Sequence, residues 1–386
     1  MAYDYREAYR NDLARIEQGI VEMSQKVKRE WKMRQYCFAY ANFKTFMPEI
    51  VTGNNGEDVF VELLKVRART PLDQRYLERI DEIELSGEYE QVVQRQGGPF
   101  IFCSYHLGSY RNVVLFLASL GYDFTLLVDQ GVYDNQKEET ERLVAAANQR
   151  YGVKSEFQVL NAEEFGSAMT MLKHLREGKS ILAFIDGNRG SGGTPKDESQ
   201  VLKIGFMKRE IYVRQGLAYI SHVTGCPIVP VVSYRKTLDD ITLHFYPRIL
   251  PNTGLGKKAY CIQTTEQLYQ YLETNLKQYP MQWEGWLYIH KYLDTSGLLP
   301  VAVQIPQKKE GLSWQFNQQR FGLFEFGGEW HLFDFDTYQT YIIPESVFRW
   351  FEKVIAAGSV EAVIDEAYSN DEWLDQLKEQ QVLIIK

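Results

Sequence analysis

Cysteine is scarce in this chain, and its few cysteines lie far apart. The four are Cys37, Cys103, Cys226 and Cys261 in 386 residues, and no two of them have the CxxC spacing. The absence of this spacing excludes a zinc ribbon or a thioredoxin-like motif. Isolated thiols suit a reducing compartment, where cysteine acts as a small buried apolar side chain. We therefore expect a cytoplasmic protein.

A long hydrophobic run of the membrane-spanning kind is also missing. Residues 1–18 are charged throughout and contain no apolar segment like that of a signal peptide. Residues 215–234 are uncharged and long enough to span a bilayer, but they include Gly225, Pro227 and Pro230. Those residues favour a helix followed by a buried strand. The sequence predicts no transmembrane segment and a soluble chain, with docking on a membrane surface as the alternative.

Basic residues are outnumbered by acidic ones. The chain has 43 Lys and Arg against 51 Asp and Glu, a formal net charge of −8. This balance disfavours a protein that coats nucleic acid or anionic membrane. Hydrophobic residues make up 45% and charged residues 24%, which is globular composition. The length predicts two to three domains, or one large domain with an appendage.

The chain divides by sequence pattern into four segments. Residues 1–98 have the apolar spacing of helices and end in a Gly-Gly-Pro run. Residues 99–294 alternate short apolar runs with helical stretches. Residues 295–313 are a proline-containing linker, and residues 314–386 predict a small α+β domain.

The central segment predicts an α/β fold. We expect strands at 100–105, 124–128, 156–160, 180–186, 227–232 and 242–246. We expect helices at 112–120, 138–149, 165–176 and 215–223. Strands that alternate with helices at this spacing indicate βαβ units and a mostly parallel sheet flanked by helices. Functional residues gather at the carboxyl ends of the strands in such sheets.

The C-terminal segment predicts a strand pair followed by helices. Two short strands are expected within 321–335, around Gly327 and Gly328. Apolar residues then share helix faces at 347–355 and at 360–364.

His106 is the first candidate for chemistry. It follows the strand expected at 100–105, where an imidazole can face a cleft beside free backbone N–H groups. A histidine there can take a proton from an amine or hydroxyl that attacks a carbonyl. Gly108, with Ser109 beside it, would let the chain pass close to a substrate. The alternative is a histidine that only satisfies a buried turn.

A glycine-rich loop is the second candidate. Asp186 ends an expected strand, and Gly187 and Gly190 are two of the four glycines that follow it by residue 193. Such a loop permits close backbone approach to a phosphate or an oxyanion, and Arg189 would help to stabilise its negative charge. It lacks the residues of a P-loop and the GxGxxG order of a dinucleotide site. The alternative is a flexible surface loop.

Four basic residues form the third candidate, around a Gly-Phe-Met-Lys-Arg-Glu turn. They are Lys203, Lys208, Arg209 and Arg214. Such a cluster could hold a phosphate or a phosphopantetheine. The alternative is solvated charge.

Taken in order, these segments resemble the lysophospholipid acyltransferase-like family, and most closely the late lipid A acyltransferases. Residues 106–111 are similar to that family's His-x4-acid motif, and residues 185–190 to its strand that ends in Asp before a glycine-containing loop. Residues 206–231 resemble its basic turn, helix and TGxPxVPV strand. Residues 280–291 resemble its closing Pro-x-Gln-Trp segment. The likeness covers about residues 1–294.

The chain departs from that family at the acid. Arg111 stands where the resemblance places a carboxylate that orients the imidazole. An arginine would instead lower the imidazole pKa by repulsion between like charges. Either Asp186 or Asp129 replaces the carboxylate, or His106 acts alone, or activity is lost. A buried guanidinium also needs an anion, which could be either aspartate or a carboxylate or phosphate of the substrate.

The resemblance implies an acyltransferase that uses acyl-CoA or an acyl carrier protein as donor. The acceptor would be an amine or hydroxyl of a soluble small molecule or peptide in natural-product biosynthesis. The residues that it assigns are His106, Asp186 and Arg111 for catalysis, and Gly108, Ser109, Gly187, Arg189, Lys208 and Arg209 for binding. No metal, tightly bound cofactor or nucleic acid is expected.

Two other functions stay open. One is a peripheral lipid acyltransferase, and the other is an inactive scaffold that binds an acyl chain or a peptide. Residues 314–386 weakly resemble the small PqqD-like winged-helix domains that hold peptides. The alternative for this segment is a dimerisation or capping domain.

Overall fold

The computed structural model describes residues 4–26, 31–52, 56–187, 201–237, 239–252, 254–299, 313–363 and 371–385. The chain forms two compact units. The first comprises Met1–Val21 and Val61–Leu293, and the second comprises Glu22–Phe60 and Asp294–Lys386. The second unit thus combines part of the N-terminal helical region with the C-terminal segment.

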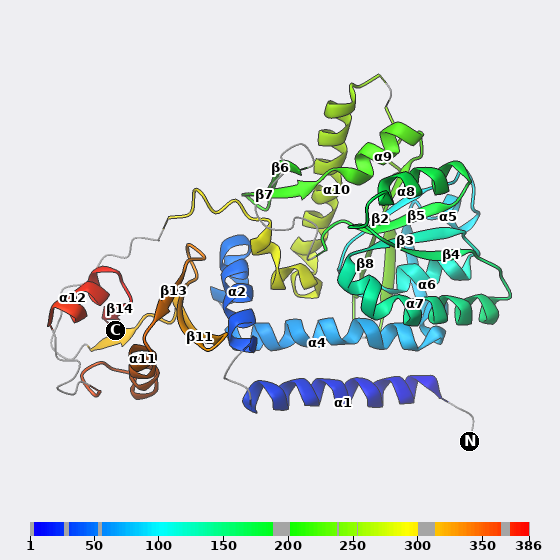
Figure 1. Cartoon of the computed structure of the whole chain (residues 1–386). Helices are drawn as coiled ribbons and strands as arrows, with labels where there is room; N and C mark the ends of the chain where they lie inside the picture. Colours follow the sequence, from blue (N-terminus) through cyan, green and yellow to red (C-terminus); the bar gives the residue numbers. More distant parts are fainter. Residues whose placement is uncertain are drawn as a thin grey trace. The chain divides into compact units, whose positions relative to one another are not determined.

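A seven-stranded sheet forms the centre of the first unit, in the order β1-β9-β8-β2-β5-β3-β4 (Figure 1). The strands are β1 (Ile83–Gly87), β2 (Ile101–Ser104), β3 (Phe124–Val128), β4 (Phe157–Asn161), β5 (Ser180–Phe184), β8 (Ile228–Tyr234) and β9 (Ile241–Phe245). Neighbouring strands are parallel except for β8 and β9. The predicted α/β fold with a mostly parallel sheet is confirmed.

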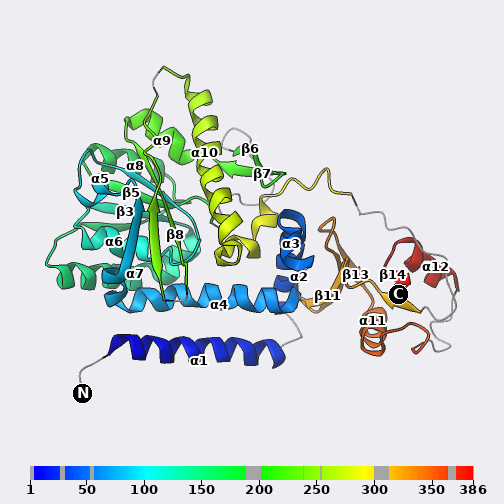
Figure 2. The same cartoon turned by 180° about the vertical axis from the view of Figure 1, so that it is seen from behind.

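Helices cover both faces of this sheet. They are α6 (Asn112–Ser119), α7 (Gln130–Tyr151), α8 (Ser167–Arg176), α9 (Gly216–Thr224) and α10 (Lys257–Gln278). Helices α6 and α7 lie together on one face, and α8, α9 and α10 lie together on the other (Figures 1 and 2). Every residue of β2 is therefore buried, which explains why the strand is apolar apart from Ser104.

The main core lies between the sheet and helix α6. Phe102 of β2 and Phe124 of β3 pack there with Leu115 and Leu117 of α6, and all four side chains are at most 1% exposed. A central strand and the helix that follows it are thereby fixed to each other. This packing places the turn between them, residues 105–111, at the carboxyl edge of the sheet.

Three elements of the first unit differ from the prediction or were not predicted. Strand β1 lies in the region expected to be helical. It pairs with β9 at the edge of the sheet, and its residues are half-buried or exposed. An antiparallel hairpin of β6 (Val201–Phe206) and β7 (Arg209–Arg214) surrounds the basic turn. Helix α10 buries Thr264, Thr265 and Asn275 along with its apolar residues, so its sequence lacks a clear apolar stripe.

Further helices complete the N-terminal part of the chain. They are α1 (Tyr5–Lys26), α4 (Gly56–Arg75), the short η1 (Leu77–Glu82) and α5 (Glu90–Val93). In the first unit, Tyr9 and Leu13 of α1 pack on Leu72 of α4. This contact brings polar residues of α4 towards the sheet.

The second unit is rich in short strands. Its elements are α2 (Trp31–Phe46), α3 (Pro48–Thr52), β10 (Trp314–Phe316), β11 (Phe321–Phe326), β12 (Glu329–Asp334), β13 (Thr340–Ile343), α11 (Glu345–Ala357), α12 (Asp371–Glu379) and β14 (Leu383–Ile385). The expected strand pair around Gly327 and Gly328 is confirmed as the hairpin β11–β12. A helix face at 360–364 is not, because Gly358 ends α11 in the left-handed conformation and Val360 donates its N–H to Trp314. Ile364 lies outside the described residues.

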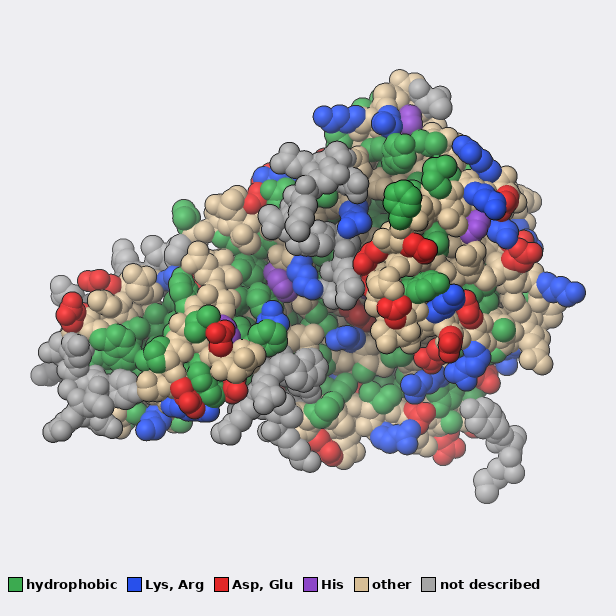
Figure 3. Space-filling model, in the orientation of Figure 1, with side chains coloured by type: hydrophobic (Ala, Val, Ile, Leu, Met, Phe, Trp, Pro, Cys, Tyr) green, Lys and Arg blue, Asp and Glu red, His purple; other side chains and the backbone are tan. Residues whose placement is uncertain are grey.

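Within the described part of the chain, no helix is long and apolar enough to cross a membrane. Figure 3 shows one face of the molecule, on which Lys and Arg side chains are interspersed with Asp and Glu. On this face, positive and negative side chains are therefore not separated into large regions of one sign.

Candidate active site

Two adjacent parallel strands bring His106 and Asp186 together. Strand β2 ends at Ser104 and β5 at Phe184, and these two residues lie opposite each other in the register. Nδ1 of His106 is 2.8 Å from Oδ1 of Asp186. The backbone N–H of His106 also donates to both carboxylate oxygens, at 3.0 and 2.9 Å. The pair therefore joins the ends of two central strands.

The indole of Trp283 fixes the carboxylate from another side. Trp283 lies between the short helices η2 (Pro280–Gln282) and η3 (Glu284–Leu287), and its Nε1–H donates to Oδ2 of Asp186 at 2.6 Å. The Asp186 side chain is only 2% exposed. A carboxylate accepts but does not donate, so the hydrogen between it and His106 belongs to Nδ1. Nε2 is left as the proton acceptor and has no hydrogen-bond partner among the described residues.

The surroundings favour the charged form of the imidazole. Burial lowers the pKa of His106, but the charge and hydrogen bond of Asp186 and the charge of Glu284 outweigh it, and the pKa is raised above its ordinary value. Arg111 opposes this rise. An imidazole that takes up a proton here would be stabilised by Asp186 beside it.

Aromatic rings and a glycine surround the imidazole. The centroid of its ring is 4.7 Å from that of Tyr110 and 5.2 Å from that of Phe184. A Cβ atom at Gly187 would lie 3.4 Å from Cε1 of His106, which is van der Waals contact with the ring. The imidazole thus packs against two aromatic rings and lies beside Gly187.

The segment that contains Trp283 also holds the turn after β2. Gly108 donates its N–H to the carbonyl of Gln282, and Glu284 donates its N–H to the carbonyl of His106, each at 3.0 Å. The side chain of Gln282 bonds the backbone N–H and the carbonyl of Arg235, at 2.8 and 2.7 Å. Backbone hydrogen bonds on both sides of the turn therefore position His106.

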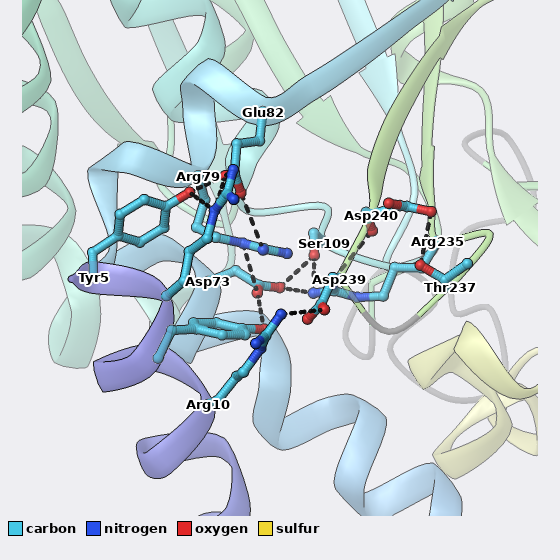
Figure 4. A network of polar contacts seen from close by, with 12 residues as sticks. Tyr5, Arg10, Asp73, Arg79, Glu82, Ser109, Arg235, Thr237, Asp239 and Asp240 are labelled. Carbon is cyan, nitrogen blue, oxygen red and sulfur yellow. Dashed lines mark hydrogen bonds and ion pairs between the residues drawn. The ribbon is translucent and has the colours of Figure 1, made fainter.

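A buried ionic network anchors the same turn from helix α4 (Figure 4). The carboxylate of Asp73 is fully buried and accepts hydrogen bonds from Tyr9 at 2.7 Å, from the Ser109 hydroxyl and from the Arg235 guanidinium. Nε of Arg79 lies 3.9 Å from Asp73. Ser109 is itself 0% exposed. Its hydroxyl is thus bonded inside the protein and does not line a cleft.

Gly108 is required by the neighbouring strand. Its φ is +58°, and a Cβ atom there would lie 2.7 Å from the carbonyl oxygen of Ser233 in β8. Both the conformation and the space favour glycine. Close packing of backbone on backbone therefore explains this residue.

Arg111 and Glu284 lie beside the His106–Asp186 pair. Arg111 precedes helix α6, and its guanidinium carbon is 6.0 Å from the centre of the Tyr110 ring. Glu284 has a side chain that is 13% exposed, and its Oε2 is 4.0 Å from Nε of Arg67. Burial raises the pKa of Glu284, while His106, Arg67 and Arg111 act in the opposite direction.

The basic hairpin is linked to the site through an aromatic contact. Met207 and Lys208 have φ values of +47° and +64° and form the two-residue turn between β6 and β7. The adjacent Phe206 ring lies 5.9 Å from that of Trp283, centroid to centroid. Lys208 and Arg209 therefore lie in the chain just after Phe206, whose ring contacts the Trp283 side chain that bonds Asp186.

The structure groups some of the residues singled out in the sequence and separates others. His106, Asp186 and Gly187 lie together, with Arg111 close to them. Asp129 caps helix α7 by accepting the N–H of Val132 at 2.9 Å. Two further residues, Arg189 and Gly190, lie outside the described residues.

Trp283, Glu284 and Asp73 were not predicted as functional residues from the sequence. Trp283 and Glu284 fall in the segment 280–291 that carried the family resemblance, which was an available signal. Asp73 is 36 residues from Ser109 and 162 from Arg235, so no local pattern indicates their contact.

Among the described residues, no group of three or more His, Cys, Asp or Glu side chains is arranged to hold a metal ion. No protein-family model matches the chain, and no curated protein is significantly similar to it. We therefore infer the function from the chemistry of the site.

Proposed function

We propose that the protein is an acyltransferase that moves an acyl group from a thioester donor, acyl-CoA or an acyl carrier protein, to an amine or hydroxyl acceptor. The observation that supports it best is the His106–Asp186 pair. Nδ1 is bonded to a buried carboxylate at 2.8 Å, and Nε2 is left to accept a proton. This arrangement suits a general base that activates a nucleophile.

The reaction would take place in two steps. The acceptor nitrogen or oxygen attacks the thioester carbonyl carbon, and its proton passes to Nε2 of His106. The new C–N or C–O bond forms, the C–S bond breaks, and the proton passes from Nε2 to the leaving thiolate. Asp186 would stabilise the imidazolium between the two transfers. The backbone N–H of Gly187, beside the imidazole, is our candidate for contact with the developing oxyanion.

The order of the motifs adds support. The His106 turn, the strand that ends in Asp186, the basic turn and the Trp283 segment resemble those of lysophospholipid acyltransferase-like proteins in sequence. In this chain the His106 turn, the Asp186 strand and the Trp283 segment meet at one carboxylate, and the basic turn contacts Trp283 through Phe206. We propose a soluble acceptor and a place in natural-product biosynthesis.

The central test is a donor assay with His106→Ala. Acyl-CoA and acyl carrier thioesters would be incubated with amine and alcohol acceptors, and free thiol and acylated product would be measured. We expect His106→Ala to lower turnover about 100-fold or more, because general bases contribute about 10²–10⁴. Wild-type turnover in this variant would refute the role of His106. Absence of turnover in the wild type, with an acyl chain or peptide still bound, would favour a scaffold instead.

A second test concerns the donor. Lys208 and Arg209 are exposed on the hairpin, and in this proposal they bind the donor phosphates. Replacing both with Ala should raise the KM for the donor and reduce the salt dependence of binding. Lys236→Ala removes a cation that is paired with Glu84 and is the control. Unchanged donor KM in the double variant would remove Lys208 and Arg209 from the donor site.

A further inference from the structure

Among the residues that the structure describes, Arg111 forms no ion pair with a carboxylate. Among the described residues, the ion pairs of the site join Arg67 to Glu284 and His106 to Asp186, and neither includes Arg111. A partly buried guanidinium that lacks a carboxylate partner is costly, because the charge has lost part of its hydration without compensation. Such a group is typical of a position that binds an anionic ligand.

The position of Arg111 ties it to the candidate base. The Tyr110 ring packs against the His106 imidazole, with 4.7 Å between centroids, and the guanidinium carbon of Arg111 is 6.0 Å from the centre of the Tyr110 ring. Arg111 is also close enough to both His106 and Glu284 to act on their charges. A ligand atom bonded to Arg111 would therefore lie within a small molecule's length of Nε2.

Among the described residues, the two carboxylates near Nε2 both have other partners than Arg111. Asp186 is occupied by His106 and Trp283. Glu284 is shared between two guanidiniums and lies 4.0 Å from the nearer of them, Arg67. Within the described part of the site, Arg111 therefore has no carboxylate of its own.

We propose that Arg111 binds a carboxylate of the acceptor, and that the acceptor is an amine with a carboxylate close to it, as in an α-amino acid. This inference rests on the proposed acyl transfer, because it specifies the acceptor of that reaction. A carboxylate held on the guanidinium fork would place the neighbouring amine towards Nε2. The amine nitrogen then bonds to the thioester carbonyl carbon and the C–S bond breaks. Its proton passes through Nε2 to the thiolate, which leaves an N-acyl amino acid and a free thiol.

The experiment compares matched acceptors with the full chain. Glycine, leucine and phenylalanine are each paired with the corresponding carboxamide, with octanoyl-CoA and palmitoyl-CoA as donors. Free thiol and N-acyl product are measured. We expect kcat/KM to be at least about 100-fold higher for each acid than for its amide, because a site built to bond a polar group rejects analogues that lack it.

The outcomes separate the two proposals. Equal kcat/KM for acids and amides would overturn the carboxylate-binding role and leave acyl transfer standing. Turnover with neither kind of amine, nor with alcohols, would contradict the proposed function itself. Acylation of alcohols alone would keep the function and overturn the choice of acceptor.

Variants of Arg111 supply the second arm. Arg111→Gln should abolish the preference for acids over amides, Arg111→Lys should keep part of it, and Arg111→Glu should reverse it. Arg142→Gln, an exposed change on helix α7, is the matched control and should keep the full preference. If Arg111 instead binds donor phosphates, Arg111→Gln would raise the donor KM equally with both kinds of acceptor. That result, or an Arg111→Glu enzyme that is faster with amino acids, would overturn the proposal.

Discussion

Trp283 and His106 bond different oxygens of one carboxylate. The indole N–H donates to Oδ2 of Asp186 at 2.6 Å, and the imidazole uses Oδ1 at 2.8 Å. Since each oxygen has its own ring donor, rotation of the carboxylate would break both bonds. The indole therefore fixes the direction in which Nε2 of His106 points, although it does not touch the imidazole nitrogen.

Trp283→Phe tests this positioning role. Phenylalanine keeps a ring against Phe206 but removes the donor to Oδ2. We expect kcat to fall by as much as about 100-fold with little change in the donor KM, because small displacements of a base are costly. Trp286→Phe is the control, since its indole donates to the Pro280 carbonyl at 2.6 Å and not to Asp186. Equal losses in the two variants would show that packing, and not the bond to Asp186, matters.

The pH dependence of turnover should respond in opposite directions to two substitutions. The neutral imidazole is the active form, so activity falls as the pH drops through the pKa of His106, which is above its ordinary value. Asp186→Asn removes the charge that raises this pKa and should move the acid limb to lower pH. Arg111→Gln removes a charge that lowers it and should move the limb to higher pH. A limb that stays in place in both variants would show that another group controls the profile.

Glu284 should make the folded state less stable as the pH rises. Burial raises its pKa in the folded protein, so the folded chain holds this proton more tightly than the unfolded chain. The contribution of Glu284 to folding stability is then greatest below its unfolded pKa and is lost as the pH rises through its folded pKa. Relative to wild type, Glu284→Gln should be more stable near pH 7 than near pH 4.

Denaturant unfolding at the two pH values measures this difference. Glu139→Gln, an exposed change on helix α7, should show no comparable difference between them. If Glu284→Gln also shows no difference between the two pH values, burial does not raise the pKa of Glu284.

The buried network around Asp73 should be far more important for stability than an exposed ion pair nearby. Asp73→Ala leaves the Arg235 guanidinium buried without its carboxylate, which typically costs about 3–5 kcal/mol. Asp239→Ala removes only an exposed pair with Arg10 and should cost less than about 1 kcal/mol. Denaturant unfolding of both variants provides the comparison. Similar values would contradict the anchoring role of Asp73.

The local sequence pattern was sufficient to predict strands whose residues are almost all buried. The strands β2 and β5 are apolar apart from one serine each. The residues that follow them, His106 and Asp186, were identifiable because they come at the ends of those runs. Strand β1 is short and partly exposed, so its sequence does not differ clearly from a helix edge. The pattern therefore shows central strands better than edge strands.

Contacts between distant residues could not be read from the sequence. Trp283 and Asp186 are 97 residues apart, and Asp73 and Arg235 are 162 apart. Each of these bonds depends on how α4, β5 and the 280–284 segment pack in space. Polar residues whose partners lie in other elements look the same in the sequence as solvated ones.

Gly108 also limits what a loss of activity can reveal. Because any side chain at this position would collide with the β8 backbone, substitution would push the His106 turn off its strand whatever ligand is present. An alanine scan that records turnover alone would therefore class Gly108 with the base itself. The two can be separated by melting temperature: a residue that only performs chemistry can be replaced without loosening the protein, whereas Gly108→Ala should lower the melting temperature and the turnover together.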